Sequence, residues 1–431
     1  MPDPASPADE QPAAGRLPPD PAAGEPQTGY RASLPTVLRE WGRIGCIGFG
    51  GPPAHIALLR KLCVDDKRWL DAREFEDAIA ACNLLPGPAS TQLAIFCAWR
   101  VRGRPGALAG GAAFIVPGLV VILALSVLFL AGTPPLWVRG AGAGAGAAVA
   151  AVAVQAGWAL VPPSWKRAAG SRGLRWTGSR GLRWTGYLLA GGASAATIGP
   201  WLVLVLVGCG ITELAIQHHQ SSAGTQAITA LPVLAARALR AAGPARALGT
   251  VTGAAALLPV AWTALKVGAL SFGGGFVIIP LMQGDAVHAY HWMTNAQFLN
   301  GVALGQITPG PVVQTVATVG YAAAGIGGGL LASLVAFFPS FAFVLGGARH
   351  FDALRGNHHA LAFLDGAGPA AIGAILGSAI PLARALSQPW QYAVLAAAAL
   401  LLGLRRGVVV TLLAAAAAGT VIALAGGPLP H

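Results

Sequence analysis

The polar residues on which chemistry could rest lie beside two kinds of glycine- and proline-rich break. The first break is Phe49-Gly50-Gly51, which recurs as Phe272-Gly273-Gly274, and the second is Pro86-Gly87-Pro88, which recurs as Pro309-Gly310-Pro311. Proline and glycine interrupt helices, and a helix that restarts exposes unpaired N–H groups at the positive end of its dipole. Such helix ends bind phosphate- and sulfate-like anions. The breaks therefore predict a binding site for a small oxyanion.

Hydrogen-bond donors flank the two Pro-Gly-Pro motifs and are candidate ligands of that anion. Thr91 and Gln92 would begin the helix after the first motif, and Gln314 the helix after the second. Asn83 precedes the first motif at the position that Gln306 occupies before the second. The alternative is that these side chains only satisfy backbone groups that the prolines leave without partners.

Three side chains near the glycine-rich breaks could carry a positive charge. His55 could hydrogen-bond the substrate, carry a proton, or be structural. Arg43 aligns with Lys266 at the offset of 223 residues that relates the motifs. A cation in an apolar segment usually faces a cavity or a counter-ion, and two such cations would suit a small dianion. The alternative is that both extend to the membrane interface.

Three acids are candidates for proton coupling. Glu76 and Asp77 open the segment that leads to the first Pro-Gly-Pro motif, where pairing with the helix dipole explains them equally well. Asp365 precedes Gly366-Ala367-Gly368-Pro369. For Asp365 the sequence favours a role as the N-cap of the next helix.

The elements that must position these residues are membrane helices. The 431 residues are 55% hydrophobic and only 10% charged, whereas soluble domains carry about 25% charge. Apolar runs such as Gly106–Leu130, Ala141–Val161, Tyr187–Ile216 and Gly407–Gly426 are long enough to span a bilayer as helix. We therefore expect an all-α polytopic membrane protein with roughly 10–13 membrane segments.

Several classes of function are disfavoured by the sequence. The net charge of +12 arises from basic residues in short loops, which orient membrane proteins and do not indicate nucleic-acid binding. A Walker-type P-loop, a nucleophile elbow and metal-like His or Cys spacing are all absent from the sequence. We expect no enzymatic activity, no cofactor and no metal site, and we expect the five cysteines to be core residues.

The shared offset indicates one ancestral unit used twice. We divide the chain into a disordered tail (1–33), a first transporter repeat (34–161), a basic loop with connecting span or spans and a linker (162–256), and a second repeat with C-terminal helices (257–431). The Tyr187–Ile216 run could form one long span or two short ones. Residues 162–186 contain an exact duplication, Ser171–Gly178 and Ser179–Gly186, which we interpret as a sequence slip in a tolerant cytoplasmic loop. The alternative is a site for anionic lipid headgroups.

The charges of the loops predict that the two repeats are inverted. Residues 60–76 contain five Lys and Arg, whereas the matching residues 283–296 contain none. The loops after the Pro-Gly-Pro segments show the same contrast. The positive-inside rule then places the loops of the first repeat in the cytoplasm and those of the second outside, as in many secondary transporters. Residues 75–99 would enter the membrane and return as a re-entrant hairpin, and the alternative is one kinked span.

At these residues the chain resembles the CHR family of chromate ion transporters, long-chain type. The motifs that carry the resemblance are Phe49-Gly50-Gly51-Pro52 with His55, Leu85-Pro86-Gly87-Pro88, and their second copies. The resemblance implies export of chromate from the bacterial cytoplasm across the inner membrane, driven by the proton motive force, with sulfate as an analogue and chromate resistance as the outcome. It also implies that these motif residues act in transport.

Alternatives from other classes remain open from the sequence. They are an uptake carrier for sulfate or a related oxyanion, a passive anion channel, and a non-transporting membrane subunit in which the breaks are structural. The expected partners are the oxyanion, protons and the lipid bilayer, and a homo-oligomer is possible.

Overall fold

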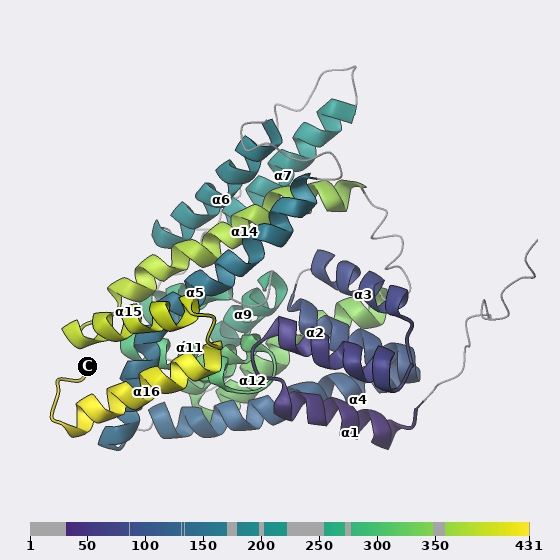
Figure 1. Cartoon of the computed structure of the whole chain (residues 1–431). Coiled ribbons are helices and arrows are strands. Elements are labelled where there is room, and N and C mark those ends of the chain that lie inside the picture. The colour runs from purple at the N-terminus through teal and green to yellow at the C-terminus, as the bar shows by residue number, and fades with distance from the viewer. Residues whose placement is uncertain are drawn as a thin grey trace, which may run out of the picture.

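The computed structural model describes residues 32–85, 87–130, 132, 134–169, 179–197, 202–221, 254–271, 277–347 and 358–430. The predicted tail lies almost wholly outside these ranges, as do Pro86, Phe272-Gly273-Gly274 and the first copy of the duplication. The described residues form helices joined by turns, which confirms the all-helical prediction. Figure 1 shows the arrangement of these helices.

The first half contains seven α-helices and one π-helix among its described residues. They are α1 (Leu34–Ile47), α2 (Pro52–Arg60), π-helix η1 (Lys61–Asp66), α3 (Ala72–Leu84), α4 (Ala89–Leu130), α5 (Leu136–Ala169), α6 (Ser179–Thr197) and α7 (Leu202–Ser221).

The described part of the second half begins with a similar series. It contains α9 (Ala254–Leu270), α10 (Ile278–Gln283), π-helix η4 (Gly284–Ala289), α11 (Asn295–Ile307), 3-10 helix η5 (Val312–Gln314), α12 (Thr315–Gly347), α14 (His358–Arg384), α15 (Pro389–Gly403) and α16 (Val408–Leu424).

The backbone of the second half reproduces that of the first at special positions. The π-helices η1 and η4 begin 223 residues apart, and so do α3 and α11. Arg68 and His291, at the same offset, both adopt a positive φ, of 49° and 54°. The long helices α4 and α12 are interrupted at Gly103 (φ 63°, ψ −156°) and Gly325 (φ 64°, ψ −156°). The two halves therefore share their local fold as well as their motifs.

Each Pro-Gly-Pro motif lies at the tip of a helical hairpin. Arg100 near the end of the helix that follows the first tip forms an ion pair with Glu74 in the first turn of α3. A single kinked span would place these residues about 39 Å apart, at 1.5 Å per residue. In the second half, a Cβ on Gly301 of α11 would lie 3.0 Å from Cγ2 of Thr318 in α12. The contacts favour the hairpin over a kinked span, and the depth of the tips in the membrane stays a prediction.

Helices of the two halves also pack against each other in a reciprocal way. Helix α14 packs against α6 and α7, while α5 packs against α15 and α16. Small residues permit this close approach: Gly373 of α14 contacts the Leu188 carbonyl of α6, and Gly140 of α5 lies against Gly419 of α16. Because α6–α7 and α15–α16 take equivalent parts in this packing, we propose that the first repeat extends to Ser221.

The described helices support a multi-pass membrane protein. Five of them are long and apolar enough to cross a bilayer by length and composition, and three more are apolar but shorter. The predicted number of roughly 10–13 membrane segments stays a prediction. The apolar run Tyr187–Ile216 forms parts of two helices, α6 and α7, and not one span.

The second copy of the duplicated octapeptide is helical, so its assignment to a tolerant loop was wrong. Ser179–Gly186 forms the first two turns of α6. Trp184 is buried there, donates a hydrogen bond to Ser164 (3.2 Å) and packs edge-on against Trp165. The sequence signal was available, because Gly181 and Trp184 lie three residues apart on one helix face.

Candidate functional site

The Pro-Gly-Pro tip of each half makes a crosswise contact with the end of a helix in the other half. The Gly48 carbonyl at the end of α1 accepts a hydrogen bond from the Gly310 N–H at the second Pro-Gly-Pro tip (3.0 Å). At the first tip, a Cβ on Gly87 would lie 3.4 Å from the Gly268 carbonyl near the end of α9. Each Pro-Gly-Pro tip thus contacts the segment around the glycine-rich break of the other half.

His55 is buried between these elements and has a protein partner on each ring nitrogen. Its Nε2 lies 2.9 Å from the Gly48 carbonyl oxygen, which can only accept, so Nε2 carries a proton. Its Nδ1 lies 3.3 Å from Ser90 Oγ, and the ring packs edge-on against Phe114. His55 therefore ties α2 to the end of α1 and to the first turn of α4. A direct contact with substrate stays a prediction that would require one of these bonds to break.

The first glycine-rich break needs its glycines for conformational reasons. Gly50 and Gly51 have φ of 96° and 74°, a region that residues with a side chain rarely adopt. Gly51 lies just before Pro52, the first residue of α2. Phe49, which was also predicted to contact substrate, has 45% of its surface exposed. The break shapes the backbone, and the Phe49 side chain lies at the surface.

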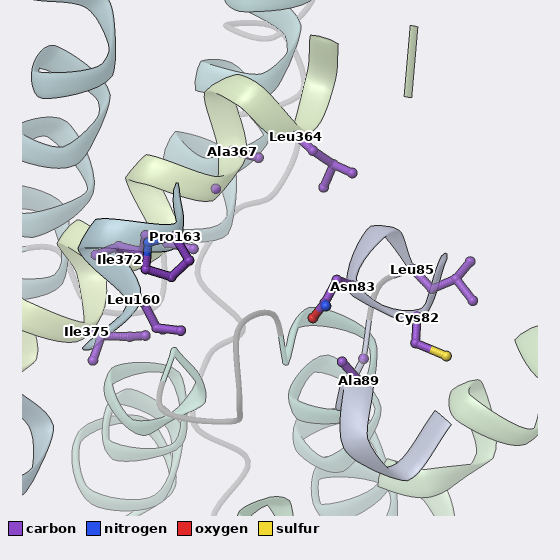
Figure 2. Close-up of a pocket in the computed structure, with 13 residues that line it drawn as sticks. Cys82, Asn83, Leu85, Ala89, Leu160, Pro163, Leu364, Ala367, Ile372 and Ile375 are labelled. Carbon is purple, nitrogen blue, oxygen red and sulfur yellow. The ribbon is translucent and has the colours of Figure 1, made fainter. Parts of the chain in front are cut away.

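A cavity of about 110 Å³ lies beside the first Pro-Gly-Pro tip. One wall is the hairpin, with Asn83, Gly87 and Ala89, and the other belongs to α5 and α14. Figure 2 shows the amide of Asn83 pointing from the hairpin toward Leu160 and Pro163 on the opposite wall. The lining is mostly apolar with a few polar groups, which is the usual character of a small-molecule site.

Several buried polar atoms have no hydrogen-bond partner among the described residues. A buried polar group without a partner costs about 1–3 kcal/mol, so such atoms indicate a place for a ligand or water. The sequence did not indicate Ser340 as a ligand, since a serine in an apolar helix has no local signature, and it did not indicate Ser271, which directly follows α9. The atoms are Thr91 Oγ1, Gln155 Oε1, Ser271 Oγ, Gln306 Nε2, Gln314 Oε1 and Ser340 Oγ.

The two aligned cations each pair with an acid. Arg43 is 58% exposed and lies 3.5 Å from Glu40 on its own helix. Lys266 Nζ lies 2.5 Å from Oδ2 of Asp285 in η4, and Thr263 donates to the same oxygen (2.9 Å). Asp285 was missed because it lies in a predicted loop.

Helix geometry places the Lys266 side chain away from the first tip. Lys266 and Gly268 are two residues apart, so their side-chain directions differ by about 200° around α9. The Gly268 carbonyl faces Gly87, and the Lys266 ammonium lies over the ring of Trp262, a residue with 55% of its surface exposed. The structure does not bring Lys266 and Arg43 together at the tips.

Comparison with known proteins identifies the family. The family model described as Chromate transporter matches residues 36–214 and 258–420, which is most of the chain. The chain belongs to the chromate transporter family. A chromate transport protein of Pseudomonas aeruginosa is 31% identical over 361 residues, covering 83% of this chain and 82% of that protein. One from Cupriavidus metallidurans is 30% identical over 378 residues, covering 85% and 87%. No solved structure shows significant similarity.

The family match confirms the resemblance seen in the motifs and the expectation of a transporter rather than an enzyme. An uncharacterized transporter of Methanocaldococcus jannaschii is 26% identical over 323 residues, so similar chains occur in archaea as well. The matched ranges of the chromate transporter family contain all four breaks and every predicted site residue. They also include most of α6 and α7.

The acids proposed for proton coupling lie in different surroundings. Glu76 is 62% exposed and pairs with Arg60 (3.0 Å), and Asp77 is half-buried on the same helix. The N-cap of α3 is Asp71, which accepts from the Glu74 N–H (2.7 Å).

Asp365 is not an N-cap, because α14 begins seven residues earlier, at His358. The glycines and Pro369 suggested a helix start, but membrane helices tolerate them. Asp365 instead accepts from Gln217 (3.3 Å). Gln217 also donates to buried Glu213, which holds Arg183 through two hydrogen bonds of 2.9 and 3.2 Å. Glu213 is a further buried acid that the sequence reasoning missed.

The pair of Lys266 and Asp285 gives a testable prediction about stability. Lys266→Met should destabilise the protein by about 3 kcal/mol, because it leaves the mostly buried Asp285 carboxylate without its cation. The double variant Lys266→Met with Asp285→Asn should regain most of this stability and should still transport. Thermal unfolding in detergent and transport in vesicles measure the two effects. A stable double variant without transport would instead assign Lys266 to substrate binding.

Proposed function

We propose that this protein is a secondary transporter that exports chromate from the bacterial cytoplasm across the inner membrane. The observation that carries the proposal is a restarting helix at the first Pro-Gly-Pro tip, where Gly87 borders a cavity on one side and lies close to the buried, unpartnered hydroxyl of Ser340. Helix N-termini and uncharged donors of this kind suit a small oxyanion. Membership of the chromate transporter family makes chromate the substrate of choice, with sulfate as the analogue of the same shape.

The arrangement of the breaks supports alternating access between two inverted halves. The loop charges favour hairpins that enter the membrane from opposite sides, and each tip contacts a helix end of the other half. Rocking of one half against the other would expose a site at the contact between the halves to each side in turn. The reciprocal packing of α5 and α14 gives the two halves a common scaffold.

Of the two components of the proton motive force, we assign the membrane potential, and not the pH gradient, as the main driving force for export. A dianion that leaves an inside-negative cell moves down the potential, which contributes about 4.6 kcal/mol per 100 mV for two charges. A dedicated proton-binding acid is therefore not required for export.

Accumulation of radiolabelled chromate in inverted membrane vesicles tests the proposed function. Vesicles that contain the protein should accumulate chromate when energised, and an uncoupler should abolish the accumulation. Competition by sulfate would support a site for tetrahedral oxyanions. Vesicles that accumulate no more than vesicles without the protein would refute export, and equilibration without accumulation would refute the coupling of export to the membrane potential.

A further inference from the structure

We propose that the oxyanion binds at the first Pro-Gly-Pro tip only, and that the hydroxyl of Ser340 is a ligand that sets its affinity. This proposal rests on the proposed function and names the residues of its site. It follows from a difference between two tips that otherwise share their local fold.

The helix that covers each tip differs at one equivalent position. Helices α4 and α12 each contain an internal proline, Pro117 and Pro339, followed by Gly118 and Ser340 respectively. A Cβ on Gly118 would collide with the Pro309 carbonyl and with Gln314, so the second tip packs against bare backbone. At the first tip the equivalent residue of α12 has a side chain, that of Ser340. Its Oγ lies 3.3 Å from the position that a Cβ on Gly87 would take.

Two donors of the second tip already have protein acceptors, whereas Nε2 of Gln306, three residues before Pro309, has none among the described residues. The Gly310 N–H donates to the Gly48 carbonyl at 3.0 Å. The Gln314 side chain donates through Nε2 to the Ile115 carbonyl at 2.5 Å, and only its acceptor oxygen has no partner. An anion needs donors, and the side chains of this tip offer it one, the Gln306 amide, against the two hydroxyls and the Asn83 amide of the first tip. The second tip therefore serves as an anchor between the halves.

The first tip combines space with donors. It borders the cavity of about 110 Å³, into which the Asn83 amide points. Ser340 and Thr91 are both fully buried, and neither hydroxyl oxygen has a hydrogen-bond partner among the described residues. Neither residue lines the cavity itself, but Gly87, which does, lies beside the Ser340 hydroxyl. Thr91 lies in the first turn of α4, where the helix dipole favours negative charge.

The class of ligand follows from these groups. The donors are hydroxyl, amide and N–H groups without a formal charge, since the Lys266 side chain points away from this tip and pairs with Asp285. Such donors can surround a compact anion that presents several oxygens, which is a small tetrahedral oxyanion. Hydrogen bonds to a charged partner are the stronger kind, so one hydroxyl has a measurable effect on affinity.

Equilibrium binding of chromate to the purified full-length protein tests this proposal. Ser340→Ala should raise the dissociation constant for chromate on the order of 10–100-fold, the range for one hydrogen bond to a charged group. Ser340→Thr retains the hydroxyl and should bind within about threefold of wild type. The matched control is Ser378→Ala, since Ser378 is also buried in an apolar helix but donates to the Ile375 carbonyl within that helix (2.7 Å).

The outcomes separate this proposal from the proposed function. Wild-type binding of chromate together with unchanged affinity in Ser340→Ala would overturn the assignment of Ser340 and leave the transporter intact. Failure of the wild-type protein to bind chromate at all would overturn the proposed function itself. If Ser340→Ala does not fold, as judged by its unfolding temperature, Ser340→Gly decides, because Gly118 shows that glycine fits the equivalent position.

Discussion

Energised inverted vesicles should concentrate chromate by a factor on the order of 10³ for each 100 mV of inside-positive potential. Two negative charges gain about 4.6 kcal/mol per 100 mV, and each 1.4 kcal/mol is a factor of ten. Radiolabelled chromate inside the vesicles, measured against an imposed potassium diffusion potential, gives this factor directly.

Ionophores supply the control for this expectation. Valinomycin with equal potassium on both sides removes the membrane potential and should abolish the accumulation of chromate. Nigericin removes the pH gradient and should leave most of the accumulation intact. The reverse pattern would show that the pH gradient, and not the membrane potential, drives accumulation. It would then direct attention to the buried acids Glu213 and Asp285 as coupling residues.

Gly87→Ala should reduce chromate transport by at least about 100-fold in protein that still reaches the membrane. Gly87 has φ of 119°, a conformation that costs a residue with a side chain about 1–2 kcal/mol. The added methyl group would also lie 2.7 Å from Gln92 Nε2 and 3.3 Å from Ser340 Oγ. It would thus fill the space in which we place the anion. Initial rates in vesicles at matched protein levels measure the loss.

Two further glycines serve as matched comparisons for Gly87. Gly310→Ala also imposes strain, at φ of 93°, but its methyl group would have no neighbour closer than 3.5 Å. We expect it to lower the unfolding temperature and to keep transport within about tenfold of wild type, since only the first tip binds the anion. The methyl group added by Gly346→Ala would enter open space, so this variant should transport chromate as fast as wild type. Equal losses in the Gly87 and Gly310 variants would argue for two equivalent sites.

The repeated motifs were sufficient to predict the main features of the fold. Paired glycine and proline motifs at one offset locate the breaks, because few residues other than glycine adopt the positive φ of Gly50, Gly87 and Gly310. Apolar runs locate the long helices. The positions of the breaks and of the long helices follow from local composition, so they can be predicted without knowledge of any tertiary contact.

The residues that complete the site and the core could not be predicted from the sequence alone, and the reason is physical. Ser340, Asp285 and Glu213 acquire their roles from neighbours that are distant in the chain, such as Gly87, Lys266 and Arg183. The role of His55 could not be decided from the sequence, because its two hydrogen-bond partners depend on how α2 packs against α1 and α4. Local rules also misplaced Asp365, since a Gly-Pro run that ends soluble helices is tolerated within α14.

Alternating access depends on the opposite orientation of the two halves in the membrane. Labelling of one matched pair of positions tests this orientation most directly. Asp66 and Ala289 end the equivalent π-helices η1 and η4 and are both exposed. Each would be replaced by cysteine in a Cys46→Ser background, which removes the exposed native thiol among the described residues. In intact cells a membrane-impermeant maleimide should label Ala289→Cys and should label Asp66→Cys only after the membrane is opened. Labelling of both positions from the same side would contradict the inverted arrangement.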